Sequence, residues 1–153
     1  MNDGRDQRPV LELAAKVNRA LWGRRLSDVD IDALIARVEQ TGERDTTWLD
    51  VYQLGFGNNP RAIPVLAKLV AHTNEYVRMA AISGLGTLHA VEEFDRLKQI
   101  ATSGGMWQDR AIALKAIGDL ATPEAKAFLD AEWERLGADL EGRWSRSVIA
   151  LYK

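Results

Sequence analysis

The chain has 153 residues and a formal net charge of −2, with 46% hydrophobic and 27% charged residues and no cysteine. This length fits a single domain, residues 1–153, with a sizeable core, and the composition is that of an ordinary globular protein. The charge balance argues against a nucleic-acid partner bound through a broad positive field, because phosphate contacts need clustered Lys and Arg. The lack of cysteine excludes disulfides, a thiolate nucleophile and Cys-based metal sites.

The first residues of the chain are charged and are followed by an amphipathic segment, which is unlike a secretory signal. No apolar run in the sequence is long enough to span a bilayer. We therefore expect a cytoplasmic protein that is a monomer and has no membrane partner.

Helical periodicity runs along almost the whole chain, and no alternating strand pattern appears. Ser27 with Asp30 resembles a capping box at the start of a helix near 28–41, and a further helix covers about 45–57. Before these, a first helix is predicted over 8–23 by an apolar stripe that contains Val10, Leu13, Ala14, Val17 and Leu21.

Capping and proline signals predict where later helices begin. Asn59 and Pro60 fit an N-cap and a first helical position, and Pro64 either kinks that helix or marks its true start. Thr122 before Pro123 caps another helix. The remaining helices are expected at about 75–88, 91–102, 107–121, 123–136 and 140–152.

An internal repeat decides the architecture that the sequence predicts. The segment from Arg78 to Leu88 aligns with the segment from Arg110 to Leu120 at an offset of 32 residues. Both contain an arginine, a central alanine, an aliphatic residue followed by glycine, and a closing leucine. A period of 31 to 32 residues that holds two helices predicts an all-α fold, an α-solenoid in which antiparallel helix pairs stack into a superhelix.

One stretch resembles the second helix of a HEAT repeat of the short, phycobilin-lyase-like kind, and it reads Asn74-x-x-Val77-Arg78-x-x-Ala81-x-x-Gly84-Leu85-Gly86-x-Leu88. The proline-bearing first helix of such a repeat is resembled by Ile63-Pro64-x-Leu66. The resemblance implies a right-handed solenoid with 8–23 as an N-terminal cap helix and about four HEAT-like repeats, 28–57, 60–88, 91–121 and 123–152.

Two glycines lie inside this second helix, where each should cost roughly 1 kcal/mol relative to alanine. Gly86 recurs as Gly118 at the repeat period, and a missing side chain allows neighbouring backbones to approach closely. Gly84 aligns with Ala116 and therefore requires only a small residue. We expect Gly84→Ala to be tolerated and a large side chain at Gly86 to destabilise the stack.

Arg78 and Arg110 occupy the arginine position of the repeat. By resemblance, each pairs with an acidic or amide group of an adjacent repeat, as part of a structural ladder. Asp109 stands where the repeat pattern has valine, which suggests that the third repeat enters its second helix differently.

HEAT solenoids line their concave side with the second helix of each pair, so the resemblance implies partner-binding positions on that helix. If Val77 and Ala81 face the core, then side chains on the other side of the helix face a groove. Applied at the repeat period, this places Gln108 and Ala111 in the groove as well. The predicted partner-binding residues are Trp48, Tyr52, Tyr76, Met79, Ser83, Trp107, Lys115, Asp119 and Trp144.

Other interpretations of these aromatic and acidic residues stay open. Trp48 and Phe56 equally fit plain core packing of a degenerate first repeat, and Trp107 is either an anchor or a lid over a repeat junction. The segment from Asp119 to Glu141 holds seven acidic residues against two basic ones. It is either a solvated helix face or an acidic surface that engages a basic partner.

The sequence thus favours a non-enzymatic module that binds a partner protein on its concave surface, an adaptor or regulator, of which a toxin-neutralising immunity protein is one version. We expect no catalytic residue, no metal site and no cofactor. The alternative is a HEAT-like enzyme or accessory, similar to the alkylpurine DNA glycosylases or to chromophore lyases. A glycosylase groove would need basic residues beside Trp48, Tyr52 and Asp50, and the chain has no matching excess of Lys and Arg.

Overall fold

The computed structural model describes residues 25–41, 48–103 and 105–153, and the cap helix expected over 8–23 lies outside them. The described residues form eight α-helices and three short 3-10 helices, with no strand. The α-helices are α2 (Asp28–Gln40), α4 (Trp48–Phe56), α5 (Ile63–Leu69), α6 (Glu75–Thr87), α7 (Phe94–Thr102), α8 (Trp107–Leu120), α9 (Pro123–Arg135) and α10 (Leu140–Ile149). The 3-10 helices are η1 (Pro60–Ala62), η2 (Val91–Glu93) and η3 (Ala150–Tyr152).

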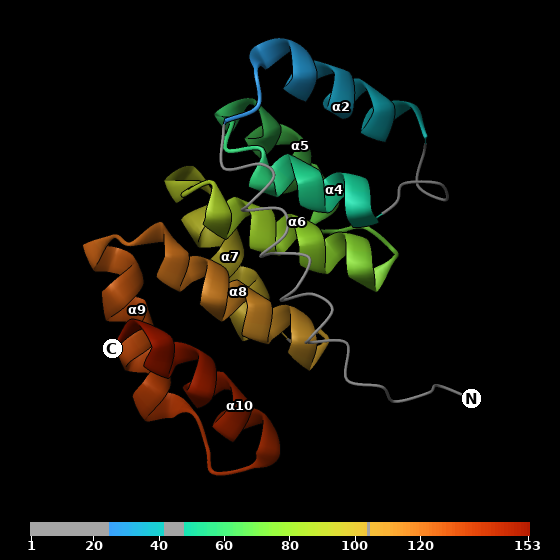
Figure 1. The fold of residues 1–153 in the computed structure, drawn as a ribbon. Coiled ribbons are helices and arrows are strands. Elements are labelled where there is room, and N and C mark those ends of the chain that lie inside the picture. The colour runs from blue at the N-terminus through green and yellow to red at the C-terminus, as the bar shows by residue number, and fades with distance from the viewer. Residues whose placement is uncertain (1–24, 42–47, 104) are drawn as a thin grey trace.

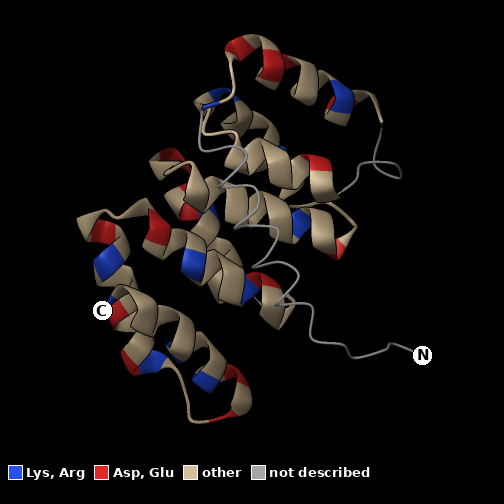
Figure 2. Cartoon of the chain, in the orientation of Figure 1, with Lys and Arg blue, Asp and Glu red and all other residues tan. Residues whose placement is uncertain are grey.

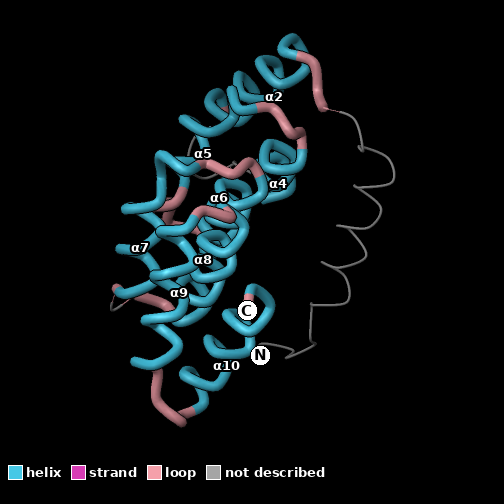
Figure 3. Tube along the Cα trace, turned by 90° about the vertical axis from the view of Figure 1, so that its left-hand side faces the viewer, coloured by secondary structure: helices cyan, strands magenta, loops and turns pink. Residues whose placement is uncertain are grey.

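The helices form antiparallel pairs that stack into a curved array, α2 with α4, α5 with α6, α7 with α8 and α9 with α10 (Figure 1). The second helices α4, α6 and α8 lie side by side on the inner side of the bend, and α5, α7 and α9 lie on the outer side (Figure 3). Neighbouring pairs contact each other mainly through α4 with α6, α6 with α8, and α8 with α10. The all-α solenoid predicted from the repeat is therefore confirmed.

The helix starts follow the predicted capping signals. Asn59 is fully buried, and its Oδ1 accepts the backbone N–H of Arg61 at 3.1 Å, as an N-cap does. Its Nδ2 also donates to Leu26 O at 3.1 Å and to Asp28 Oδ1 at 2.8 Å, so one side chain joins the start of α2 to the start of η1. Pro64 is the second residue of α5, and it therefore marks the start of that helix rather than a kink within it.

Close contacts between second helices explain the glycines inside them. A Cβ atom added to Gly55 on α4 would lie 2.6 Å from Gly84 Cα on α6. A Cβ on Gly86 would lie 2.6 Å from Ala116 Cα on α8. The helix backbones are therefore packed against each other where a side chain is missing, and α6 has two glycines because it has a neighbour on each side.

At the junction of α8 with α10, an aromatic ring takes the place of the small residue. A Cβ on Gly118 would lie 2.5 Å from Tyr152 Cδ2, in the 3-10 helix η3 that follows α10. Gly118 therefore accepts the Tyr152 ring against the α8 backbone. The repeat pattern of the sequence does not predict that a tyrosine ring packs on Gly118.

We predict that Gly55→Ala and Gly86→Ala each lower the free energy of unfolding, by about 1–3 kcal/mol, because the new methyl group meets a helix backbone. The free energy of unfolding of Gly84→Ala should stay closer to that of the parent protein. Its Cβ would meet the movable Leu66 Cδ1 at 2.9 Å and Gly55 Cα at 3.1 Å, and the better helix propensity of alanine offsets the cost. Urea unfolding measures all three.

The control for these variants is Gly137→Ala, since the nearest atom to a Cβ at Gly137 lies 3.9 Å away. This substitution should leave the unfolding midpoint unchanged. A larger loss for Gly84→Ala than for Gly86→Ala would contradict the contacts described above.

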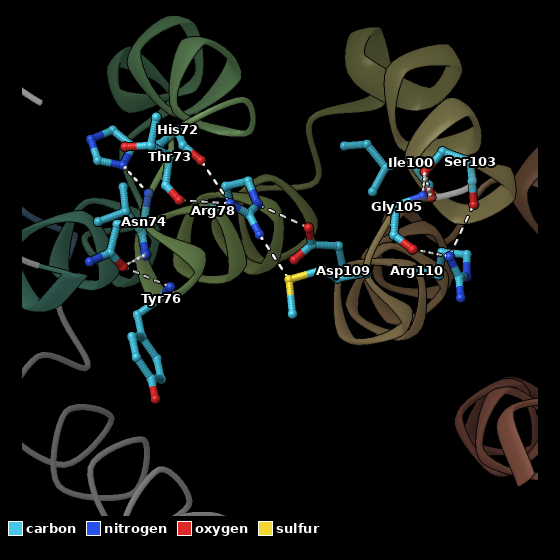
Figure 4. Close-up of polar contacts among 12 residues, drawn as sticks. His72, Thr73, Asn74, Tyr76, Arg78, Ile100, Ser103, Gly105, Asp109 and Arg110 are labelled. Carbon is cyan, nitrogen blue, oxygen red and sulfur yellow. Dashed lines mark hydrogen bonds and ion pairs between the residues drawn. The ribbon is translucent and has the colours of Figure 1, made fainter. Parts of the chain in front are cut away.

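At the opposite end of the second helices, arginine side chains connect successive repeats (Figure 4). Arg78 Nε on α6 donates to Asp109 Oδ2 on α8 at 2.9 Å, and Arg78 Nη1 donates to the carbonyl oxygens of His72 and Thr73 at 2.9 and 3.1 Å. One guanidinium therefore holds the turn of its own repeat and the first turn of the next second helix, which confirms the predicted ladder.

The same arrangement recurs one repeat later. Arg110 Nε donates to Glu141 Oε1 on α10 at 2.6 Å, and Arg110 Nη1 donates to the carbonyl oxygens of Ser103 and Gly105. Arg78 and Arg110 are each the fourth residue of their helix. The second helix of the third repeat therefore starts at the same position relative to its arginine, and a shifted start is not what distinguishes it. What differs is the cap, because the Met106 side chain accepts no hydrogen bond from the first backbone N–H groups of α8, whereas the Asn74 side chain accepts two at the start of α6.

We predict that Arg78→Met lowers the free energy of unfolding by about 1–3 kcal/mol, since it leaves Asp109 and two carbonyl groups without their donor. The matched control is Arg61→Met, because Arg61 pairs with Asp32 and both side chains are about half exposed. That exposed pair should contribute less than about 1 kcal/mol. Equal losses in urea unfolding for the two variants would contradict a structural role for Arg78.

Candidate functional site

The structure places all nine predicted partner-binding residues on second helices. Trp48 and Tyr52 lie on α4, and Trp144 lies on α10. Those on the two central helices are Tyr76, Met79 and Ser83 on α6, and Trp107, Lys115 and Asp119 on α8. We call the solvent-facing side of α4, α6, α8 and α10 that these nine residues form the inner face.

Large aromatic side chains are exposed near the start or middle of each of these helices. Between 37% and 48% of the surface of each residue is accessible for Trp48, Tyr76, Trp107 and Trp144. Trp48, Tyr76 and Trp107 are the first or second residue of α4, α6 and α8, and these helices pack side by side. Trp and Tyr present a large apolar area and a hydrogen-bonding group together, which suits them to contact another protein.

Three of these aromatic residues contact another aromatic residue of the inner face. The ring centroids of Trp107 and Trp144 lie 5.7 Å apart, so this pair bridges α8 and α10. Trp48 packs edge-on against Tyr52 on the same helix, with centroids 6.3 Å apart. The ring centroids of Tyr52 and Phe56 lie 4.3 Å apart, and Tyr52 is half-buried against the core. Tyr52 therefore provides the surface on which the exposed Trp48 packs.

The smaller side chains of the inner face are less accessible. Met79 and Ser83 are half-buried on α6, as is Gln108 on α8. Ala111, which the repeat period placed in the groove, is buried, and that expectation is wrong. The helical period gives the direction in which Ala111 points, whereas its burial follows from the side chains of the adjacent helices.

Charged and hydrogen-bonded side chains lie near the C-terminal end of α8, at the edge of the inner face. Lys115 Nζ lies 2.7 Å from Asp119 Oδ2, in an i, i+4 ion pair. The other oxygen of Asp119 accepts a hydrogen bond from the Tyr152 hydroxyl at 2.6 Å. Asp119 is therefore held from two sides. Tyr152 could not be predicted as a member of this group, because nothing in the repeat pattern places it opposite Asp119.

The acidic segment predicted over 119–141 carries basic residues among its carboxylates. Lys and Arg are interspersed with Asp and Glu on the ribbon instead of forming one uniform patch (Figure 2). Lys126 pairs with Asp130, and Arg135 pairs with Glu132. Among the described residues, no group of three or more His, Asp or Glu side chains is arranged to hold a metal ion. None of the helices that the structure describes has the length and hydropathy to cross a membrane.

A stack of antiparallel helix pairs, with second helices lining the inner side and an arginine ladder between repeats, defines the class of α-solenoid repeat proteins. The family model of HEAT repeats matches residues 31–118, which is more than half of the chain. The chain therefore belongs to the HEAT-repeat family, as the resemblance of its second helices implies. HEAT repeats commonly mediate protein–protein interactions. A comparison with curated proteins finds no match.

We predict that the contact between Tyr152 and Asp119 makes stability depend on pH in the alkaline range. Burial, followed by the hydrogen bond to Asp119, raises the pKa of Tyr152 above its ordinary value of 10.0. The folded protein therefore keeps the phenol proton at a pH where the unfolded chain loses it. The stabilisation is complete below about pH 10 and declines as the pH rises above that value.

The measurement compares the parent protein with Tyr152→Phe by urea unfolding between about pH 8 and pH 11. The parent should be more stable at about pH 8, and its advantage over Tyr152→Phe should shrink towards pH 11. Lys side chains titrate in the same range but are common to both proteins, so the difference isolates Tyr152. A difference that stays constant over the range would contradict the prediction.

Proposed function

We propose that this protein is a non-enzymatic module that binds a partner protein on its inner face, as an adaptor or regulator. One role of this kind is that of an immunity protein that masks a toxin. The observation that carries the proposal is the presence of exposed aromatic residues on four successive second helices, Trp48, Tyr76, Trp107 and Trp144.

The chemistry of the inner face supports apolar anchoring of a partner. Large aromatic residues dominate the energetics of protein interfaces when they enter pockets of the partner and lose their contact with water. Tyr76 is the most exposed of the four aromatic residues and lies on α6, in the middle of the array. A partner that covers Tyr76 therefore reaches α4 on one side and α8 on the other.

The charges on this face support a role in orientation more than in affinity. Lys115 and Asp119 form their own ion pair, and Arg78 and Asp109 are tied into the ladder. A partner gains little from charges that already have counter-ions inside the protein. The aromatic residues should therefore provide most of the binding free energy.

The test places a photo-crosslinking amino acid at Tyr76 on the inner face or, as the matched control, at Gln99. Gln99 is exposed on α7, in the outer layer. In an extract of the cells that make the protein, crosslinks to one defined protein should form from position 76 and not from position 99. Trp107→Ala should reduce that crosslink at least about tenfold, as expected for a residue in the centre of an interface.

The melting temperature of each variant shows whether it is still folded. Equal crosslinking from positions 76 and 99 would contradict the inner face as the binding surface. Crosslinks that disappear when the extract is treated with nuclease would favour the alternative of a DNA-binding, glycosylase-like protein.

A further inference from the structure

The described part of the chain begins at the C-terminal end of α4. Leu26 N–H donates to the carbonyl oxygen of Gly57 at 2.8 Å, and Gly57 directly follows the last residue of α4. The carbonyl oxygen of Leu26 accepts from Asn59 Nδ2 at 3.1 Å, and the Leu26 side chain packs against the core. The segment that precedes residue 25 therefore joins the array beside α4, one of the helices that form the inner face.

The sequence of that segment contains an apolar stripe. On the helix predicted over 8–23, the stripe consists of Val10, Leu13, Ala14, Val17 and Leu21. Glu12 and Arg19 lie on the opposite side of the same helix. A single helix of this length is only marginally stable in water, and packing of its apolar side provides most of its stability. The stripe therefore requires an apolar surface on the array.

The exposed side of α2, at the end of the array, offers little apolar surface. Apart from Val29, Ala33 and Ala36, all of the exposed residues of α2 are charged or polar. A helix stacked on this side would cover one valine and two alanines, together with carboxylates that prefer water. A cap on α2 would therefore leave much of the apolar stripe without a matching surface.

The inner face offers a larger apolar surface within reach of the same segment. Trp48, Tyr76 and Trp107 are exposed on α4, α6 and α8, and aromatic side chains bury far more apolar area than alanine or valine. At about 1.5 Å per residue, a helix over 8–23 is about 24 Å long. Packed helices lie about 8–10 Å apart, so this length is sufficient to cross α4, α6 and α8.

We propose that segment 8–23 of this chain lies as a helix across α4, α6 and α8, with its apolar stripe on the exposed aromatic residues, and that a partner protein must displace it. The inference rests on the proposed function and adds its regulation. It also differs from the cap on the first repeat that the family resemblance implies. Segment and partner compete for one surface, so the apparent affinity for the partner falls in proportion to the fraction of molecules with a free inner face.

The test places a photo-crosslinking amino acid in the purified full chain, at Tyr76 on the inner face or at Ala33 on the exposed side of α2. Mass spectrometry of the digested protein then identifies the crosslinked peptides. Position 76 should form crosslinks to peptides from 8–23, and position 33 should form none. This measurement needs no substitution within the segment, so it is decisive even if variants of the segment do not fold.

Two double variants test whether the apolar stripe makes the contact. Leu13→Asp with Val17→Asp should reduce the crosslink from position 76 to the segment at least about tenfold, because carboxylates without partners are costly to bury against aromatic rings. The matched control is Ala15→Asp with Arg19→Asn, which changes the net charge by the same amount on the opposite side of the predicted helix. This control should leave the crosslink unchanged.

The same variants test the competition with a partner. In the cell extract, Leu13→Asp with Val17→Asp should increase the crosslink from position 76 to the partner protein at least about threefold, because the inner face is free in more molecules. The matched control should capture as much partner as the parent. An unchanged yield for both double variants would overturn the competition.

The remaining outcomes separate this inference from the proposed function. Crosslinks to 8–23 from position 33 instead of position 76 would show a cap on α2 and overturn the inference. Crosslinks between two chains, which a mixture of isotope-labelled and unlabelled protein reveals, would show a second copy on the inner face and also overturn it. A crosslink to 8–23 within one chain, with no partner captured by any variant, would retain the position of the segment and reject the proposed function. Capture of a partner without any crosslink to 8–23 would retain the proposed function and reject the inference.

Discussion

The close approach of consecutive second helices, at positions with little or no side chain, sets the geometry of the whole array. Gly55 meets Gly84, and Gly86 meets Ala116, with backbone packed on backbone. At the other end of the same helices, arginine bridges connect the first turn of one second helix to that of the next. The helices α6 and α8 are thus held together at two separated points, which fixes both the distance and the angle between them.

Much of the fold could be predicted because the residues that recur at the repeat period are those that the stacking of the helices requires. Arg78 and Arg110, or Gly86 and Gly118, are related by that period. The arginines also contact carboxylates at that period, Asp109 and Glu141, whereas the contacts of the two glycines differ and could not be predicted in the same way. The small residue opposite Gly86 is Ala116, two positions before its repeat equivalent, and opposite Gly118 stands a tyrosine from a different element.

The candidate site could be predicted less fully, for a related reason. A helical period tells which way a side chain points, but the depth at which it ends depends on the neighbouring helices. Trp48 and Tyr76 are exposed, Tyr52 is half-buried and Ala111 is buried, although all were assigned to one face.

The contacts that stack the helices and the aromatic residues that face solvent use different sides of the same helices. Gly84 and Gly86 are buried between second helices, whereas Tyr76 on the same helix is turned towards water. A change of surface side chain therefore leaves the spacing of the repeats intact, and a change at a glycine alters the spacing without altering the surface chemistry. In such an array, what is recognised can diversify one repeat at a time while the architecture stays constant.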